Sequence, residues 1–426
     1  MRLNLNDPKT QYIMVLASSG ITIVFGFVLS ILMTRSMEVE QYGYYKAFTN
    51  SLTLLVTLAS LGFSLTLSKK FAVCEKTEQK RRLTGAAYVI NFAIALLVVA
   101  VAAVVYGIGK WAGVEIPSYL LLAAALVWVM LLQRFYIFRF QGENNMVLYA
   151  LLSMLPTVLL TAMAALCFAF CVPVSGWAAI TGYLMSYILP MGVFFFREIP
   201  QLSYVKEDIG SLWKENWRYG FQLHLGSLAS VASANLLNLL VAPISGLGEY
   251  AFFTMGLTLA TPVRQVPMVM GTISFKKNVK QPKLPKGQIL LTVAITAAAL
   301  VVYTLFLKYI MVLLIGQEYL ESIGYAVVLV YYDALMGMGD FFNRFIIAKG
   351  YGKMVRNNSV IVGVVLVVSA AVLVPLWTVK GVILAEMISA VIYVLLMIMC
   401  YRKIVWKGIE EKQSENQENP EKGESL

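Results

Sequence analysis

The chain has 426 residues, of which 59% are apolar and only 13% are charged, and its mean hydropathy is +0.74. Soluble domains are nearer to about 45–50% apolar and about 25% charged, so this composition excludes an ordinary soluble globular protein. The formal net charge of +11 would suit nucleic acid as a partner only if the basic residues formed a patch.

Long apolar segments recur along almost the whole chain, and each can cross a bilayer as a helix of about 20 residues. Backbone groups in lipid must be paired within the segment, and the alternating pattern of barrel strands does not occur, so we predict an all-α polytopic membrane protein. The first segment has no separable signal-peptide cleavage site and is taken as the first span. The twelve predicted spans are residues 12–33, 46–67, 86–106, 117–138, 147–171, 176–196, 219–244, 249–270, 289–315, 323–347, 359–376 and 381–401.

Lysine and arginine are distributed unequally between the two sets of loops. The N-terminus, every second loop and the C-terminal segment hold 27 of the 34 basic residues, the other loops hold 4, and 3 lie well within spans. Because cytoplasmic loops carry the excess of positive charge, both termini are predicted to be cytoplasmic. Topology thus explains the basic charge, with anionic lipid headgroups rather than nucleic acid as its partner.

The connecting segments are too short to hold a catalytic domain, so the function is expected to lie within the bundle. No nucleotide-binding GxxxxGK[ST] loop, HExxH motif or GxSxG elbow is present, and we expect neither enzymatic activity nor a cofactor. One histidine and four cysteines form no metal-binding pattern. Cys167 and Cys171 share a helix face and are interpreted as ordinary small apolar residues.

Residues 31–45 resemble residues 239–253 when the two are aligned without gaps at an offset of 208 positions, which sets Tyr42 against Tyr250. Each stretch lies between the first two spans of a six-span half, and both halves begin on the same side. We therefore predict a parallel repeat about an axis normal to the membrane. The predicted parts are two six-helix bundles at 1–205 and 206–405 and a disordered cytoplasmic tail at 406–426.

The first predicted hairpin carries a family resemblance. Arg35 ends the first span, Tyr42-Gly43-Tyr44 follows a short polar turn, and Leu61-Gly62-Phe63-Ser64 precedes a basic loop. This arrangement resembles bacterial oligosaccharide flippases, the Wzx-like polysaccharide biosynthesis and export proteins of the MATE-like superfamily. The resemblance is specific over residues 12–70 and recurs loosely at 220–271.

The resemblance implies a flippase that works by alternating access of its two halves. It would move an undecaprenyl-diphosphate-linked oligosaccharide repeat unit from the inner to the outer leaflet of the bacterial cytoplasmic membrane, for O-antigen, capsule or a similar surface polysaccharide. The implied partners are this lipid-linked oligosaccharide, membrane lipids and the polysaccharide polymerase machinery, and the protein would act as a monomer. The alternative is an ion-coupled multidrug or small-cation exporter of the same superfamily, which would favour a mostly anionic cavity. A membrane glycan polymerase is disfavoured because it would need a substantial outer loop.

Arg35 and the tyrosines that follow it have two interpretations. Arg35 can extend to the outer headgroups, and Tyr42, Tyr44 and Tyr45 suit the aromatic belt at the membrane interface. We favour this anchoring role over a substrate role for Arg35, and Pro243 stands at the equivalent position of the second half.

Ionisable side chains within spans are costly and tend to face a partner or a wet cavity. Arg264 lies between Pro262 and Pro267, which should kink or break the helix. Arg264 therefore either extends to the inner headgroups or binds an anionic substrate. Lys308 lies in the outer part of its span, where extension to the outer headgroups is favoured.

The acidic residues within the spans differ in whether a basic residue lies at helical spacing from them. Asp340 and Arg344 are four residues apart, so we favour a structural pair on one helix face. Asp333 has no basic neighbour at helical spacing, which makes it a candidate for binding a proton or a cation. Glu386 lies near the outer face, where exposure is expected.

The seventh predicted span is unusually polar, and its side chains either join helices or line a hydrophilic cavity. The candidates for substrate binding are Arg264, Arg344, Lys308, Arg35, His224, Asn235 and Asn238, those for ion coupling are Asp333, Asp340 and Glu386, and neither a catalytic residue nor a metal site is predicted.

Overall fold

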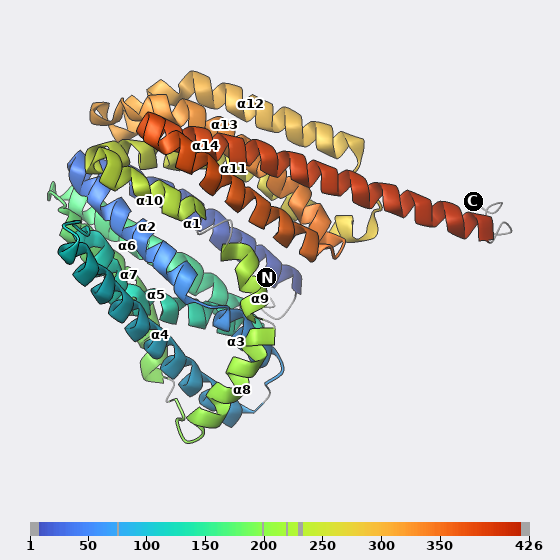
Figure 1. Ribbon diagram of the computed structural model, residues 1–426, viewed down its shortest axis with the longest axis horizontal. Coiled ribbons are helices and arrows are strands. Elements are labelled where there is room, and N and C mark those ends of the chain that lie inside the picture. The colour runs from blue at the N-terminus through green and yellow to red at the C-terminus, as the bar shows by residue number, and fades with distance from the viewer. Residues whose placement is uncertain (1–7, 75, 198–199, 219, 229–232, 419–426) are drawn as a thin grey trace, which may run out of the picture. The chain divides into compact units, whose positions relative to one another are not determined.

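The structure is a computed structural model that describes residues 8–418 except 75, 198–199, 219 and 229–232. The chain so described contains helices and no strand (Figure 1). The helices are α1 (Pro8–Ser36), α2 (Val39–Ala59), α3 (Phe63–Ala72), α4 (Thr77–Trp111), α5 (Ser118–Gly142), α6 (Met146–Ala169), α7 (Gly176–Arg197), α8 (Val205–Arg218), α9 (Gly220–Ser227), α10 (Ser233–Ser245), α11 (Leu247–Lys280), α12 (Lys286–Ile310), the short η2 (Met311–Ile315) and η3 (Gln317–Tyr319), α13 (Ser322–Ala348) and α14 (Gly352–Glu418).

The predicted all-α membrane architecture is confirmed. Within the described ranges, eight helices are long and apolar enough to cross a membrane, or nine if α2 and α3, bent by 64° where they meet, form one span. Four predicted spans have less regular counterparts. Residues 219–244 cover α9 and α10 around an undescribed gap, residues 249–270 lie within α11, and residues 359–376 and 381–401 both lie within α14.

Helix α14 is two helices joined by a sharp bend. Thr378 has a non-helical backbone, with φ 48° and ψ −120°, three residues after Pro375. In a straight helix, residues eight apart are separated by about 12 Å, yet a Cβ placed on Gly381 would collide with the carbonyl of Leu373. The chain therefore folds back here, as the two legs of α14 in Figure 1 show.

The last part of α14 differs from the sequence-based expectation. Its backbone is helical to Glu418, where the sequence predicts disorder from residue 406. Glutamate, lysine and glutamine are good helix formers, which explains why a polar segment can continue a helix. Residues 419–426 of the predicted tail lie outside the described residues.

The chain forms two compact units. One comprises residues 1–254 with 314–318, and the other comprises residues 255–313 with 319–426. The six-plus-six division at residues 205 and 206 and the pseudo-twofold axis stay predictions.

In the first unit, α5 is the central helix. It packs against α2, α3, α4, α6 and α7, and α1 packs against α6. Phe135 and Tyr136 of α5 are 1% and 0% exposed, which anchors this helix in the bundle. Helix α8 lies against α3 and α4 (Figure 1).

The first hairpin is more deeply buried in this unit than the sequence predicts. Tyr42 and Tyr45 are 0% and 5% exposed, so the prediction that they form an interfacial belt is wrong. The two residues are three apart on α2 and share its inner face. A Cβ on Gly43 would collide with the backbone carbonyl of Leu247; glycine here allows α2 and α11 to approach closely.

One pair of positions aligned by the predicted repeat is alike in its burial. Tyr250, the counterpart of Tyr42, is also fully buried. The side-chain amide of Asn50 donates a hydrogen bond of 2.6 Å to the Tyr250 hydroxyl. Burial alone does not establish the repeat, which stays a prediction.

The second unit is built around α13, which packs against α12 and α14. A hydrophobic cluster that includes Phe341, Phe345, Tyr393 and Met397 fills the space between α13 and α14. This packing fixes the faces of α13 and α14 that carry the ionisable residues of the candidate site.

Candidate functional site: charges within the helices

The guanidinium of Arg264 joins α11 to two carboxylates of α13. Its Nε and Nη2 donate to Oδ2 of Asp340 at 3.2 and 3.0 Å, and its Nη1 lies 3.9 Å from Oδ1 of Asp333. Asp333 and Asp340 are nearly two helical turns apart on one face of α13. One fork-shaped cation therefore serves two acidic groups.

Helix α14 completes this arrangement from the other side of Asp340. The Tyr393 hydroxyl donates to Oδ1 of Asp340 at 2.9 Å and accepts a hydrogen bond of 3.1 Å from Asn343. Gly339 makes the approach possible, because a Cβ there would collide with the Tyr393 ring. Both oxygens of Asp340 thus have donors.

The two prolines do not break α11, contrary to one of the outcomes expected from the sequence. The helix is continuous over Leu247–Lys280 with Pro262 and Pro267 inside it. A Cβ on Gly337 of α13 would lie 2.6 Å from the Arg264 carbonyl and 2.6 Å from Cγ of Pro267. The small residue allows α13 to rest directly on the proline-flanked turn that presents Arg264.

Acidic groups outnumber the cation in this part of the second unit. Glu386, on α14, is 1% exposed, so the expectation that it is exposed at the interface is wrong. A buried carboxylate is stable only when it is paired, protonated or bound to a cation. The cluster of Arg264, Asp333 and Asp340, hereafter the acidic cluster, is therefore suited to hold a proton or a cation.

Two basic candidates lie outside the acidic cluster. Arg344 is exposed, and Asp340 pairs with Arg264 instead, so the predicted Asp340–Arg344 pair is wrong. Spacing along one helix allows a pair, but a guanidinium from a neighbouring helix offers two donors to the same carboxylate. Lys308 is exposed on α12, as expected if it extends to headgroups.

Arg35 is also exposed, but its guanidinium is engaged. Its Nε donates a hydrogen bond of 2.7 Å to the carbonyl of Leu314 in η2. A cation at the C-terminal end of a helix satisfies carbonyls that have no partner within the helix. This contact supports a structural role for Arg35.

The polar candidates of the seventh predicted span lie in the first unit. His224, on α9, is 2% exposed, and its Nε2 lies 3.4 Å from the Ser60 hydroxyl. Asn235 and Asn238 on α10 are partly buried. The asparagines belong to the first unit, whereas the acidic cluster belongs to the second.

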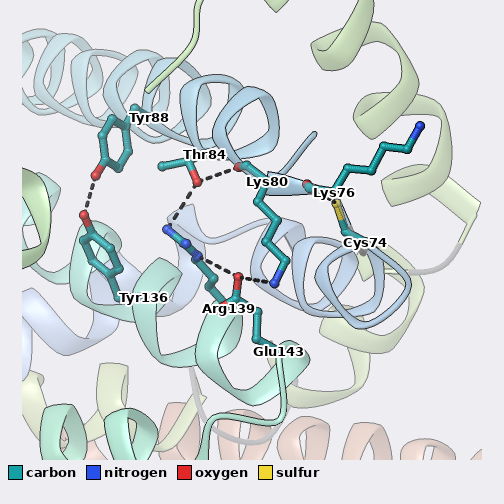
Figure 2. A network of polar contacts seen from close by, with 8 residues as sticks. All are labelled: Cys74, Lys76, Lys80, Thr84, Tyr88, Tyr136, Arg139 and Glu143. Atoms are coloured by element: carbon teal, nitrogen blue, oxygen red, sulfur yellow. Dashed lines mark hydrogen bonds and ion pairs between the residues drawn. The ribbon is translucent and has the colours of Figure 1, made fainter. Parts of the chain in front are cut away.

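A second polar network, shown in Figure 2, was not expected from the sequence. Arg139 of α5 is 6% exposed; it donates to Thr84 at 3.3 Å and to Glu143 at 3.4 Å, and Lys80 lies 3.4 Å from the same carboxylate. Tyr88 and Tyr136 are hydrogen-bonded beside it. This network joins α4 to the end of α5 and pairs its carboxylate with two cations.

Arg134 was not predicted as a candidate either, because its charge was counted together with that of Arg139 as loop charge next to the end of a predicted span. In the structure Arg134 lies within α5 and is partly buried. Its guanidinium carbon lies 5.9 Å from the centre of the Phe138 ring. Its position inside residues 117–138 is the signal that would have found it.

Comparisons with known proteins identify the family of this chain and solved structures with a similar fold. The model of a family described as polysaccharide biosynthesis protein matches residues 10–274, more than half of the chain. No curated protein matches.

Solved structures give the same architecture at low sequence identity. The lipid II flippase MurJ in an inward closed conformation has a TM-score of 0.68 and 13% identity, with 93% of this chain and 91% of that chain covered. A multidrug resistance MATE family transporter of the MOP superfamily in an inward-facing conformation has a TM-score of 0.64 and 15% identity, covering 90% and 95%. A MOP superfamily transporter from Pyrococcus furiosus has a TM-score of 0.53 and 14% identity, covering 94% and 97%. Identities this low establish the fold alone, whereas the family match establishes membership: the chain belongs to the polysaccharide biosynthesis protein family.

Proposed function

We propose that this protein is a flippase for a lipid-linked oligosaccharide. It moves an undecaprenyl-diphosphate-linked repeat unit from the inner to the outer leaflet of the bacterial cytoplasmic membrane by alternating access, for the synthesis of a surface polysaccharide such as O-antigen or capsule. Both termini face the cytoplasm, and the chain works as a monomer beside a polysaccharide polymerase.

The observation that carries the proposal is the family match over residues 10–274 in a chain whose helices span the membrane. Polysaccharide synthesis at a membrane needs a step that carries a polar glycan through hydrocarbon. The fold similarity to the lipid II flippase MurJ supports the same type of step here. An anionic lipid-linked substrate would also need a cation within the helices.

The acidic cluster is proposed to couple transport to an ion. Asp340 is fully engaged, with Arg264 at one oxygen and Tyr393 at the other. Asp333 is only 5% exposed and has the more distant contact with Arg264, at 3.9 Å. Asp333 is therefore the carboxylate that exchanges a proton or a sodium ion. Arg264 stabilises the ionised form of Asp333 and does not bind the substrate phosphate directly.

A cation exporter is the second candidate function, because one observation favours it. The acidic cluster has two carboxylates and one guanidinium, while Lys308 and Arg344 are exposed. Such an excess of negative charge suits an organic cation as substrate. The similarity to a multidrug resistance MATE family transporter agrees with this possibility at the level of fold.

Complementation separates the two functions. The gene is expressed in a strain that lacks its own flippase, and surface glycan and resistance to lipophilic cations are measured in parallel. The proposed function predicts that glycan is restored and resistance is unchanged, with Asp333→Asn restoring much less glycan at matched membrane levels. Raised resistance without glycan would establish the exporter instead.

A further inference from the structure

A polar cavity of about 360 Å³ lies in the first unit, where α8 packs against α3 and α4. Cavities of about 300–1,000 Å³ are large enough to hold a small ligand. Three basic side chains line this one: Lys70 near the end of α3, Lys76 directly before α4 and Arg82 in the second turn of α4. Because Arg82 precedes the predicted span 86–106, the cavity lies at the predicted cytoplasmic edge of the membrane.

Ion pairs hold two of these basic side chains in place. Both carboxylate oxygens of Asp208 on α8 accept from Arg82, at 3.1 and 3.0 Å. Glu215, one face further along α8, lies 3.0 Å from Lys70 and 3.0 Å from Lys69. These contacts fix α8 against the ends of α3 and α4, and they leave neither Asp208 nor Glu215 to neutralise a further cation.

Lys76 is the basic side chain of the cavity that has no carboxylate partner. It is exposed, its side chain points away from Glu143 in Figure 2, and within the described ranges no ion pair includes it. Adding Lys69 and Glu215 to the five charged residues that line the cavity gives four basic groups and three carboxylates. One positive charge is therefore in excess, which a ligand with a single negative charge would balance.

The far side of α8 indicates what lies beside the cavity. Trp213 and Trp217 are 55% and 61% exposed, and they share one face because they are four residues apart. Asp208, which lines the cavity, is nine residues before Trp217 and thus on the opposite face. Tryptophan is enriched where a membrane meets water, and a helix with such a face lies in that interface. We therefore expect α8 to lie among the headgroups of the inner leaflet.

We propose that the cavity between α3, α4 and α8 binds the headgroup of an anionic phospholipid of the inner leaflet, with Lys76 at its phosphate. The phosphodiester of such a lipid carries one negative charge, which matches the one positive charge in excess. Basic pockets between helices on the cytoplasmic side suit lipid headgroups. The lipid is a resident of the protein and not the transported substrate, so the inference does not depend on the proposed function.

The test measures lipid binding to the full-length protein in detergent by native mass spectrometry. The probes are phosphatidylglycerol, phosphatidylcholine with the same acyl chains, and glycerophosphoglycerol, which is the anionic headgroup without chains. The variants are Lys76→Ala, Lys76→Arg and, as the matched control, Lys214→Ala, which removes an exposed lysine of α8 outside the cavity. Unfolding temperatures without added lipid verify that each variant is folded.

A basic side chain beside an anionic headgroup is expected to change the affinity about fivefold. The wild type should prefer phosphatidylglycerol to phosphatidylcholine by at least this factor. Lys76→Ala should bind phosphatidylglycerol about fivefold more weakly, whereas Lys76→Arg and Lys214→Ala should bind it as the wild type does. Glycerophosphoglycerol should bind more weakly than phosphatidylglycerol because it has no chains to contact the apolar surface.

Four results would overturn the inference. The wild type binds the two phospholipids equally, or Lys76→Ala binds phosphatidylglycerol as tightly as the wild type. Equal losses in Lys76→Ala and Lys214→Ala would show a general attraction to surface charge and no site. Glycerophosphoglycerol bound as tightly as phosphatidylglycerol would assign the cavity to a soluble phosphate ester and not to a lipid.

Discussion

The positions of single charged residues in this protein are explained by their partners on other helices. Arg264 and Asp340 lie on α11 and α13, and two donors of the guanidinium meet one carboxylate oxygen. Breaking a partly buried pair leaves an uncompensated charge, so removal of one partner costs more than removal of both. This asymmetry distinguishes a true pair from two residues that are merely close.

A double-mutant cycle tests the pair. Arg264→Ala should lower the unfolding temperature of the purified protein, and adding Asp340→Asn should recover part of the loss, with a coupling energy on the order of 1–3 kcal/mol. Arg344→Ala, which removes an exposed guanidinium on the same helix as Asp340, should show no coupling to Asp340→Asn. Additive effects of Arg264→Ala and Asp340→Asn would disprove the pair.

A second pair of contacts gives an acid-dependent stability. Glu215 of α8 lies 3.0 Å from Lys69 and 3.0 Å from Lys70 of α3. Partial burial raises the pKa of Glu215, but the hydrogen bonds and charges of the two lysines outweigh it and hold this pKa below its usual 4.5. The contribution of Glu215 is therefore fully present above the pKa of the unfolded chain and is lost as the pH falls through the lower pKa of the folded state.

Glu215→Gln should consequently be less stable than the wild type at neutral pH, by a small amount because the contact is partly exposed. The difference should stay constant down to about pH 5 and shrink as the pH falls below the usual glutamate pKa of 4.5. Unfolding temperatures across this range give the measurement, with exposed Glu207→Gln on the same helix as control. A difference that grows in acid would contradict the assigned direction.

At the scale of helices, glycine residues allow two helix backbones to approach each other closely. Gly62 joins α2 to α3 with φ +82°, and a Cβ there would collide with the backbone of Gly220 and lie 2.7 Å from the nitrogen of Phe221. The motif Leu61-Gly62-Phe63-Ser64, part of the family resemblance, therefore has a physical reason. It builds a bend of 64° against the start of α9.

Gly62→Ala is predicted to destabilise the protein, because the left-handed backbone alone costs about 1–2 kcal/mol for a residue with a Cβ and the collision adds to it. Gly107→Ala is the matched control, since nothing lies within 4 Å of a Cβ at that position of α4. Unfolding temperatures of the purified variants are compared. Equal temperatures for Gly62→Ala and the wild type would refute the close contact.

Hydropathy was sufficient to predict most of the helices, because every span in lipid must pair its backbone polar groups within the segment, as a helix does. It also predicted a break between the spans 359–376 and 381–401, where the structure has the turn at Thr378. It did not predict the bend between α2 and α3, since this bend depends on contacts between backbones brought together by folding. The acidic cluster shows the same limit. Asp333 and Arg264 were each recognisable as costly charges, but they are 69 positions apart, so spacing along one helix could not pair them, and Glu386 was wrongly expected to be exposed.

At the scale of the whole molecule, the charge distribution predicts a topology that can be tested with cysteines. Cys171 is exposed at the outer end of the predicted span 147–171, and exposed Lys283 lies in a predicted inner loop. A membrane-impermeant maleimide should label Cys171 in intact cells. It should label Lys283→Cys, in a Cys171→Ser background, only after the membrane is opened. Strong labelling of Lys283→Cys in intact cells would invert the topology.

Transport by the purified protein tests the central claim most directly. Proteoliposomes are prepared with a polyprenyl-diphosphate-linked oligosaccharide that carries a fluorophore on the glycan, and an impermeant quencher reports how fast the glycan crosses the bilayer. The account predicts rapid crossing with the wild type and a rate at least about tenfold lower with Asp333→Asn, corresponding to a loss of about 1.4 kcal/mol. Crossing no faster than in protein-free liposomes, with gradient-driven export of a lipophilic cation by the same preparation, would contradict the flippase assignment.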